Sequence, residues 1–161
     1  MGIESELQSL PSHGSEPRVV LAWSMRLSSE IRHGRHCVSQ LHVHLVFVTK
    51  YRYRVLDGDA LERLRALFSK VCVDFEAELV EMDGGDSHVH LLVNYPPKNS
   101  ISALVNSLKG VSSRMLRWER PDLVRRYWKG VLWSPSYFAA SCGGAPIGVL
   151  REYIEQQKTP L

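Results

Sequence analysis

Four segments of the chain have the apolar pattern of β-strands. Residues 38–48 and 87–95 have period-two patterns in which one face is apolar and the other carries two histidines together with further apolar residues. Residues 79–82 and 137–142 are shorter apolar runs that fit the remaining strands of a sheet. Gly84, Gly85 and Asp86 lie between the second and third segments and predict a tight hairpin turn.

Three other segments repeat apolar residues at helical spacing. The first covers residues 59–76, the second begins after Asn99 or Ser100 and extends past Met115, and the third covers residues 146–158. The resulting order of elements predicts an α+β, ferredoxin-like fold (split βαβ, RRM-like), with an antiparallel sheet and two helices on one face. In the usual strand order of that fold, 4-1-3-2, the first and third strands are central neighbours.

The length of 161 residues is that of one domain. Residues 1–31 are rich in turn residues and lack sustained periodicity, so we expect a flexible or loosely docked extension before a folded domain of residues 32–161. No apolar run approaches the roughly 20 residues that a membrane span needs. The three cysteines lack close spacing, which disfavours a disulfide framework and favours a cytoplasmic protein.

Charge is distributed unevenly along the chain. Residues 57–86 contain nine acidic and three basic residues, whereas residues 98–129 contain eight basic and two acidic ones. This asymmetry allows one strongly positive surface in the folded protein, as nucleic-acid-binding proteins have. A solvated helix face explains the same charges equally well.

A His-Val-His triplet occurs twice, at His42 and His44 and again at His88 and His90. Residues two apart in a strand lie on the same face, so either pair could contribute two imidazole ligands to one metal ion. The spacing alone does not rank the two pairs, and a structural role is the more common one for such a pattern.

The last predicted helix places Tyr153 and Gln157 one turn apart, beside its apolar stripe. A tyrosine can attack a phosphodiester and conserve its energy as a phosphotyrosine, so that rejoining needs no ATP or other nucleotide cofactor. The amide oxygen of Gln157 could bind a metal ion. The alternative is a tyrosine at the edge of the core with its hydroxyl in solvent.

Six blocks in the order found here resemble the TnpA family, the small single-tyrosine HUH transposases of insertion sequences that move as single-stranded DNA. The blocks lie between about residues 36 and 158, and they are Leu41-His-Val-His-Leu-Val-Phe-Val-Thr-Lys-Tyr-Arg52, Asp86-Ser-His-Val-His-Leu-Leu-Val93, Pro96-Pro97, Leu108-Lys-Gly-Val-Ser-Ser-Arg114, Leu132-Trp-Ser-Pro-Ser-Tyr-Phe138 and Tyr153-Ile-Glu-Gln-Gln157. The extension of about thirty residues departs from the compact start of that family.

The resemblance implies a role for each residue that matches a family motif. His88, His90 and Gln157 become the ligands of Mg²⁺ or Mn²⁺, and Tyr153, on a C-terminal helix, becomes the nucleophile that forms a 5′-phosphotyrosine. The block containing the other triplet commonly shows one histidine, at the place of His44. That residue is therefore expected to support the site, and His42 is expected to be incidental.

The resemblance also implies partners. It predicts binding to single-stranded DNA hairpins at the ends of an element, and an obligate homodimer in which the tyrosine helix can serve the partner. We expect the two subunits to pair through the first strand, near residues 38–48, because an unpaired apolar edge favours association. Position and charge suggest five DNA contacts: Lys50, Arg52, Arg54, Lys109 and Arg114.

Two alternative functions remain open from the sequence. A replication initiator or relaxase of the wider HUH group would share the chemistry, although such proteins usually have more chain after the nicking core. A non-catalytic nucleic-acid-binding protein of ferredoxin-like fold, such as a retired transposase, would share only the binding. Typical RNA-recognition sheets display aromatic residues, whereas the third predicted strand displays His88, His90 and Asn94.

Overall fold

A four-stranded antiparallel sheet forms the centre of the protein. The structure, a computed structural model, describes residues 31–127 and 129–142. The sheet has the order β4-β5-β3-β6 and consists of β3 (His42–Val48), β4 (Glu78–Gly84), β5 (His88–Asn94) and β6 (Phe138–Ser141). When the four strands are numbered by chain position and the sheet is followed from β6 to β4, this is the predicted order 4-1-3-2. The first and third strands lie at the centre.

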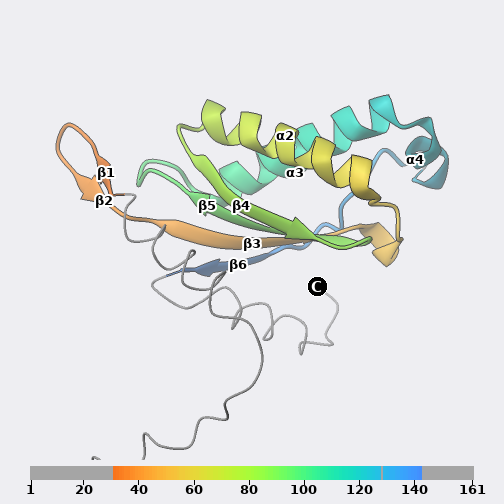
Figure 1. The fold of residues 1–161 in the computed structure, drawn as a ribbon, viewed down its shortest axis with the longest axis horizontal. Helices are drawn as coiled ribbons and strands as arrows, with labels where there is room; N and C mark the ends of the chain where they lie inside the picture. The colour runs from red at the N-terminus through yellow and green to blue at the C-terminus, as the bar shows by residue number, and fades with distance from the viewer. Residues whose placement is uncertain (1–30, 128, 143–161) are drawn as a thin grey trace, which may run out of the picture.

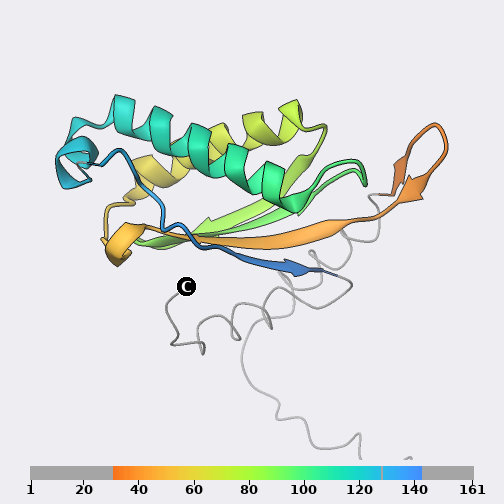
Figure 2. The ribbon, with the colours of Figure 1, turned by 180° about the vertical axis from the view of Figure 1, so that it is seen from behind.

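Two long helices cover one face of this sheet. Helices α2 (Gly58–Asp74) and α3 (Ile101–Glu119) lie side by side over the same face in both views (Figures 1 and 2). Period-two alternation directs Val43, Leu45 and Phe47 toward the helices, and all three are fully buried in the main core. The same alternation places the histidines of β3 and β5 on the opposite face.

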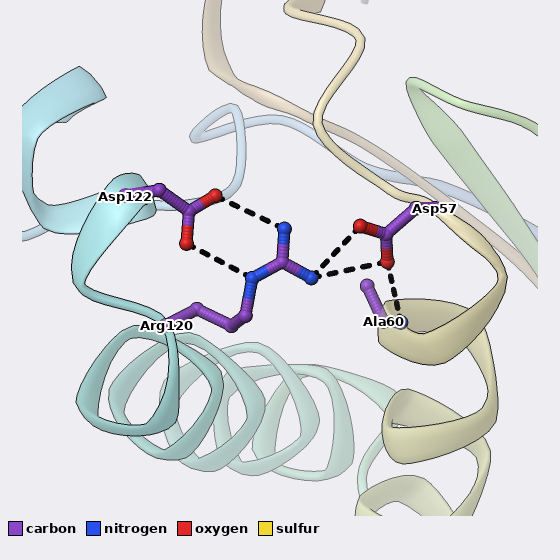
Figure 3. A network of polar contacts seen from close by, with 4 residues as sticks. All are labelled: Asp57, Ala60, Arg120 and Asp122. Atoms are coloured by element: carbon purple, nitrogen blue, oxygen red, sulfur yellow. Dashed lines mark hydrogen bonds and ion pairs between the residues drawn. The ribbon is translucent and has the colours of Figure 1, made fainter.

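Side-chain caps fix where the two helices begin. Asp57 accepts a hydrogen bond from the amide of Ala60 at 2.8 Å, and Ser100 accepts one from Ala103 at 3.2 Å. Asp57 also binds Arg120, whose guanidinium bridges to Asp122 (Figure 3). The start of α2 is thereby tied to the end of α3.

Several elements differ from the sequence prediction. Residues 120–127, for which the apolar pattern predicted no element, contain the short helix α4 (Pro121–Arg126), which begins at the proline. The first predicted strand is interrupted at residues 40–41, because β2 (Val38–Ser39) pairs instead with β1 (Arg32–His33) in a separate ribbon at one end of the sheet (Figure 1). The segment directly after β3, which contains the predicted DNA contacts Lys50 and Arg52, forms the 3₁₀ turn η1 (Lys50–Arg52).

The predicted pairing of two subunits through the first strand is wrong for β3. This strand lies inside the sheet, with β5 on one side and residues 132–142 on the other. The backbone bonds Lys50 to Leu132, Ser134 to Val48 and Cys142 to His42 close the second side along its whole length. An interior strand has no free edge to offer a second copy.

Two predicted segments lie outside the described residues, namely the extension up to residue 30 and the final helix at residues 146–158. Within residues 31–127 and 129–142, no helix is long and apolar enough to cross a membrane.

Candidate metal centre

The face of the sheet opposite the helices brings together three of the four triplet histidines. His88 and His90 project from the same side of β5, with ring centroids 5.1 Å apart and ring planes nearly perpendicular. His44 reaches His90 from the neighbouring strand, with centroids 5.4 Å apart and nearly parallel rings. This arrangement follows from the register, which pairs His90 with Val46 and His44 with Leu92.

A hydrogen bond joins Nε2 of His44 to Nδ1 of His90 at 3.2 Å. His44 is only 1% exposed, so the surrounding side chains hold its ring in place. Because Nδ1 of His90 is engaged in this way, coordination by His90 would use Nε2. Two imidazoles on one strand, one of them oriented by a third, can supply two of the donors that a divalent metal site requires.

Two glycines make room for His88, Gly85 for its ring and Gly84 for its backbone. A Cβ on Gly85 would lie 2.9 Å from Cε1 of His88, and a Cβ on Gly84 would lie 2.8 Å from the backbone oxygen of His88. The hairpin closes through a bond from the Gly85 amide to that oxygen at 3.0 Å. The sequence predicted this turn, but it gave no sign that the second glycine packs against an imidazole.

The hairpin is also fastened to the loop after β3. The Thr49 amide donates to the carbonyl of Ser87 at 2.9 Å, and the Leu56 amide donates to that of Asp86 at 2.9 Å. The Thr49 hydroxyl adds a second bond to Ser87 at 3.2 Å. Because Ser87 immediately precedes His88, these bonds fix the end of β5 that carries the histidine pair.

His42 belongs to a different group of polar side chains. Its Nε2 lies 3.2 Å from Nδ2 of Asn94, and the Asn94 side-chain oxygen accepts a bond from Arg32. Arg32 in turn donates to the carbonyl of Glu76 at 2.7 Å. This chain of contacts ties the β1–β2 ribbon to the sheet, so His42 has a structural partner although it was expected to be incidental.

The other two residues predicted for the site, Tyr153 and Gln157, lie outside the described residues. Over residues 31–127 and 129–142, no three His, Cys, Asp or Glu side chains gather as a metal site on their own. His88 and His90 therefore fit half of a coordination shell, and the predicted third ligand is an amide from the undescribed segment.

Three of the predicted DNA contacts lie in the loop after β3. Lys50 is half-buried, with its ammonium 5.2 Å from the centroid of the Tyr51 ring. Arg52 is exposed, and Arg54 is exposed and pairs with Asp86 at 3.4 Å. The loop therefore presents basic groups beside the hairpin that carries His88.

The two predicted contacts on α3 have different surroundings. Arg114 is exposed. Lys109 instead donates to the carbonyls of Ser134, Pro135 and Ser136, at 2.6, 3.1 and 3.2 Å. Partial burial lowers the pKa of the Lys109 ammonium. Lys109 thus holds the segment that leads into β6.

The family model described as "Transposase IS200 like" matches residues 37–157 of the chain. The chain belongs to the IS200-like transposase family. Within this family, the ISDra2 transposase TnpA of Deinococcus radiodurans is 34% identical to it over 131 residues, which are 81% of this chain and 94% of that protein. The IS200 transposase of Salmonella typhimurium is 30% identical over 114 residues, 71% of this chain and 74% of that protein.

Two solved structures have a fold similar to that of this chain. The crystal structure of a candidate transposase from Deinococcus radiodurans R1 matches 80% of this chain and 99% of its own, with a TM-score of 0.69 and 32% identity. A REP-associated tyrosine transposase bound to a REP hairpin matches 77% of this chain and 68% of its own, with a TM-score of 0.50. At 14% identity, the second likeness shows the fold alone.

Proposed function

We propose that this IS200-like transposase cuts and rejoins single-stranded DNA at hairpin-flanked ends of an insertion sequence. The observation that carries the proposal is the His88–His90 pair, oriented by His44 on the helix-free face of a central strand in a member of this family. Tyr153 attacks the scissile phosphodiester and forms a 5′-phosphotyrosine, and the released 3′-hydroxyl later reverses the step on another strand.

His88, His90 and Gln157 would hold Mg²⁺ or Mn²⁺, which would polarise the scissile phosphate and stabilise the leaving 3′ oxygen. Imidazole is not the preferred ligand of Mg²⁺, so phosphate oxygens and water would complete the shell. With Nε2 of His90 on the metal, Nδ1–H of His90 would donate to Nε2 of His44, which would hold the ring in the ligand position. Gly85 keeps the position of His88 open.

Four basic residues are proposed to contact DNA phosphates directly: Lys50, Arg52, Arg54 and Arg114. The fifth residue, Lys109, acts through the carbonyls that it holds before β6, because its ammonium already serves three acceptors. A hairpin is the proposed ligand because a structural neighbour is a tyrosine transposase bound to a REP hairpin. Neutralised phosphates make the affinity depend steeply on salt.

A homodimer is also part of the proposal, with exchange of the tyrosine helix between subunits. Since both sides of β3 are paired, the subunits associate through a surface other than that strand. Light scattering at micromolar concentration tests this point, and a monomer there would contradict it.

Cleavage of a labelled hairpin oligonucleotide with single-stranded flanks tests the proposed activity. We expect cleavage with Mg²⁺ or Mn²⁺ and none with EDTA, and a strand transferred to a second oligonucleotide without ATP. A non-catalytic binding protein would bind the hairpin and never cut it. A replication initiator or relaxase would nick the oligonucleotide, but would not join two hairpin-flanked ends into a circle.

His88→Ala and His90→Ala provide the matched controls for that assay. Both should bind the hairpin as the wild type does and lose metal-dependent cleavage, because each removes one of the proposed protein ligands. Retained cleavage in either variant would show that the metal lies elsewhere.

A further inference from the structure

Three tyrosine rings extend from the core to the surface at the exit of β3. Tyr127 is buried at 3% exposure, Tyr53 is half-buried, and Tyr51 is 68% exposed. The ring centroids of Tyr127 and Tyr53 lie 5.5 Å apart, and those of Tyr53 and Tyr51 also lie 5.5 Å apart. The ring of Tyr51 is therefore packed against that of Tyr53 and is open to solvent.

The backbone holds this exposed ring in an unusual conformation. Tyr51 and Arg52 have φ angles of 61° and 53°, in the left-handed region. That region is strained for a residue with a side chain, and such strain is concentrated at functional sites. Thr49 fixes the turn, accepting from the Arg52 amide at 2.9 Å and donating its hydroxyl to the Tyr53 carbonyl at 2.7 Å.

Two basic side chains lie over the rings of Tyr51 and Tyr53. Nζ of Lys50 lies 5.2 Å from the centroid of Tyr51, and Cζ of Arg126 lies 4.7 Å from that of Tyr53. In the part of the chain that the structure describes, no carboxylate forms an ion pair with Lys50, Arg52 or Arg126. Exposed aromatic rings between unpaired cations form the surface on which single-stranded nucleic acids stack their bases.

We propose that Tyr51 is a stacking platform for one unpaired base of the DNA strand, with the adjacent phosphates held by Lys50 and Arg52. The ammonium of Lys50 exchanges a weak, exposed cation–π contact with Tyr51 for a contact with a phosphate. The same loop bonds to Ser87, next to His88, so the platform stands at the metal-ligand end of β5. This inference rests on the proposed function, because it assigns a subsite to the same DNA.

The ligand is an unpaired base because a base within a duplex keeps both of its faces stacked. Stacking needs only the π-face that every base has, so the platform would favour an open flank over a particular sequence. The phosphates of a fully paired oligonucleotide would contact Lys50 and Arg52, but its bases would not stack on the ring of Tyr51.

Binding of a fluorescein-labelled hairpin with a single-stranded flank, measured by anisotropy with the full chain in EDTA, tests the platform. Tyr51→Ala and Tyr51→Gly both remove the ring, and glycine adopts the left-handed backbone freely, so at least one of them should fold. We expect binding about 5- to 150-fold weaker for both. Tyr51→Phe should stay within about twofold of the wild type, because it keeps the π-face.

Three controls isolate the contribution of stacking at Tyr51. Trp118→Ala removes an aromatic ring that is 79% exposed and takes no part in the tyrosine stack, and it should leave binding unchanged. Lys50→Ala should reduce the slope of log K against log salt by about 0.7, whereas Tyr51→Gly should leave the slope unchanged. A fully duplex oligonucleotide should bind equally to the wild type and to Tyr51→Gly.

An abasic site moved along the flank locates the stacked base. At one position the abasic site should weaken binding by the wild type until its affinity equals that of Tyr51→Gly. The inference is overturned if both ring deletions bind within about twofold of the wild type, or if no abasic position removes the difference. Binding without cleavage by the wild type would refute the proposed activity and leave the platform standing, while absence of any binding would refute both.

Discussion

Nε2 of His44 and Nδ1 of His90 are joined across two central strands at 3.2 Å. The two residues come from different His-Val-His triplets, so the triplets are not equivalent copies. One supplies both proposed histidine ligands of the metal, and the other supplies a single residue that orients one of them. The remaining histidine, His42, faces Asn94 at the other end of the shared register.

Substitution of His44 should weaken the metal site without removing it. His44→Ala takes away the group that fixes the Nδ1 proton of His90, and such supporting residues typically contribute about 10–100-fold in metal affinity or activity. Cleavage should therefore need more Mn²⁺ for half-maximal rate, and His44→Gln should recover part of the loss. An unchanged metal titration curve for His44→Ala would contradict this role.

Substitution of His42 should affect stability and not cleavage. His42→Ala leaves the buried Asn94 amide without one of its contacts, which lowers the free energy of unfolding by about 1–3 kcal/mol. Urea unfolding measures the loss, and cleavage below the unfolding transition should stay close to that of the wild type. A loss of cleavage equal to that of His88→Ala would place His42 in the metal site.

The hairpin glycines give a second way to disturb the site. Gly85→Ala puts a methyl group 2.9 Å from Cε1 of His88, so the imidazole must move. We expect reduced metal-dependent cleavage and nearly normal hairpin binding. Gly84→Ala meets backbone at 2.8 Å and should mainly destabilise the fold, by about 1–3 kcal/mol. Thermal unfolding and cleavage rates, measured for both variants, separate the loss of stability from the displacement of the His88 ring.

The Asp57–Arg120–Asp122 contacts predict a defined response to acid (Figure 3). The amide of Ala60 and the guanidinium of Arg120 lower the pKa of Asp57, and Arg120 lowers the pKa of Asp122. Their stabilising effect is complete above the unfolded-state pKa of about 4 and is lost as the pH falls through the lower folded-state values.

Arg120→Gln tests that response. At neutral pH it should lower the free energy of unfolding by about 1 kcal/mol, and the difference from the wild type should shrink as both carboxylates protonate. Urea unfolding between about pH 7 and pH 2 provides the curve. A difference that grows in acid would contradict the assigned pairing.

Lys109 and Arg114 should separate into a structural and a DNA-binding residue. Lys109→Met leaves three carbonyls without their charged donor and should lower the free energy of unfolding by about 1.5–3 kcal/mol. Arg114→Met, an exposed change on the same helix, should alter stability by less than about 0.5 kcal/mol and weaken salt-sensitive DNA binding. Equal stability of the two variants would show that Lys109 does not hold the loop.

The sequence predicted the sheet well because alternation and turn residues are local signals. The glycine hairpin and the face shared by His88 and His90 follow from spacing along the chain, and the strand order follows from the usual order of the fold that the elements predict. The hydrogen bond between His44 and His90 does not, since it depends on the register between two strands 46 residues apart.

Other features were missed because they depend on contacts between distant segments. Both sides of β3 are closed by residues 132–142 and β5, so the subunit pairing expected there fails. Lys109 looked like a surface cation from its position on α3, but the loop before β6 folds over it. The tyrosine stack combines residues 51–53 with Tyr127, which no local pattern connects.

Intact-mass analysis of the protein after incubation with a cleavable hairpin and Mn²⁺ tests the central claim most directly. The account predicts that the wild type gains the mass of the 3′-side DNA fragment, attached through its 5′ phosphate, and that peptide mapping finds it on Tyr153. Tyr153→Phe keeps the ring and loses the attacking oxygen, so it should bind the hairpin and gain no mass. An adduct on Tyr153→Phe, or cleavage by the wild type without any adduct, would contradict the account.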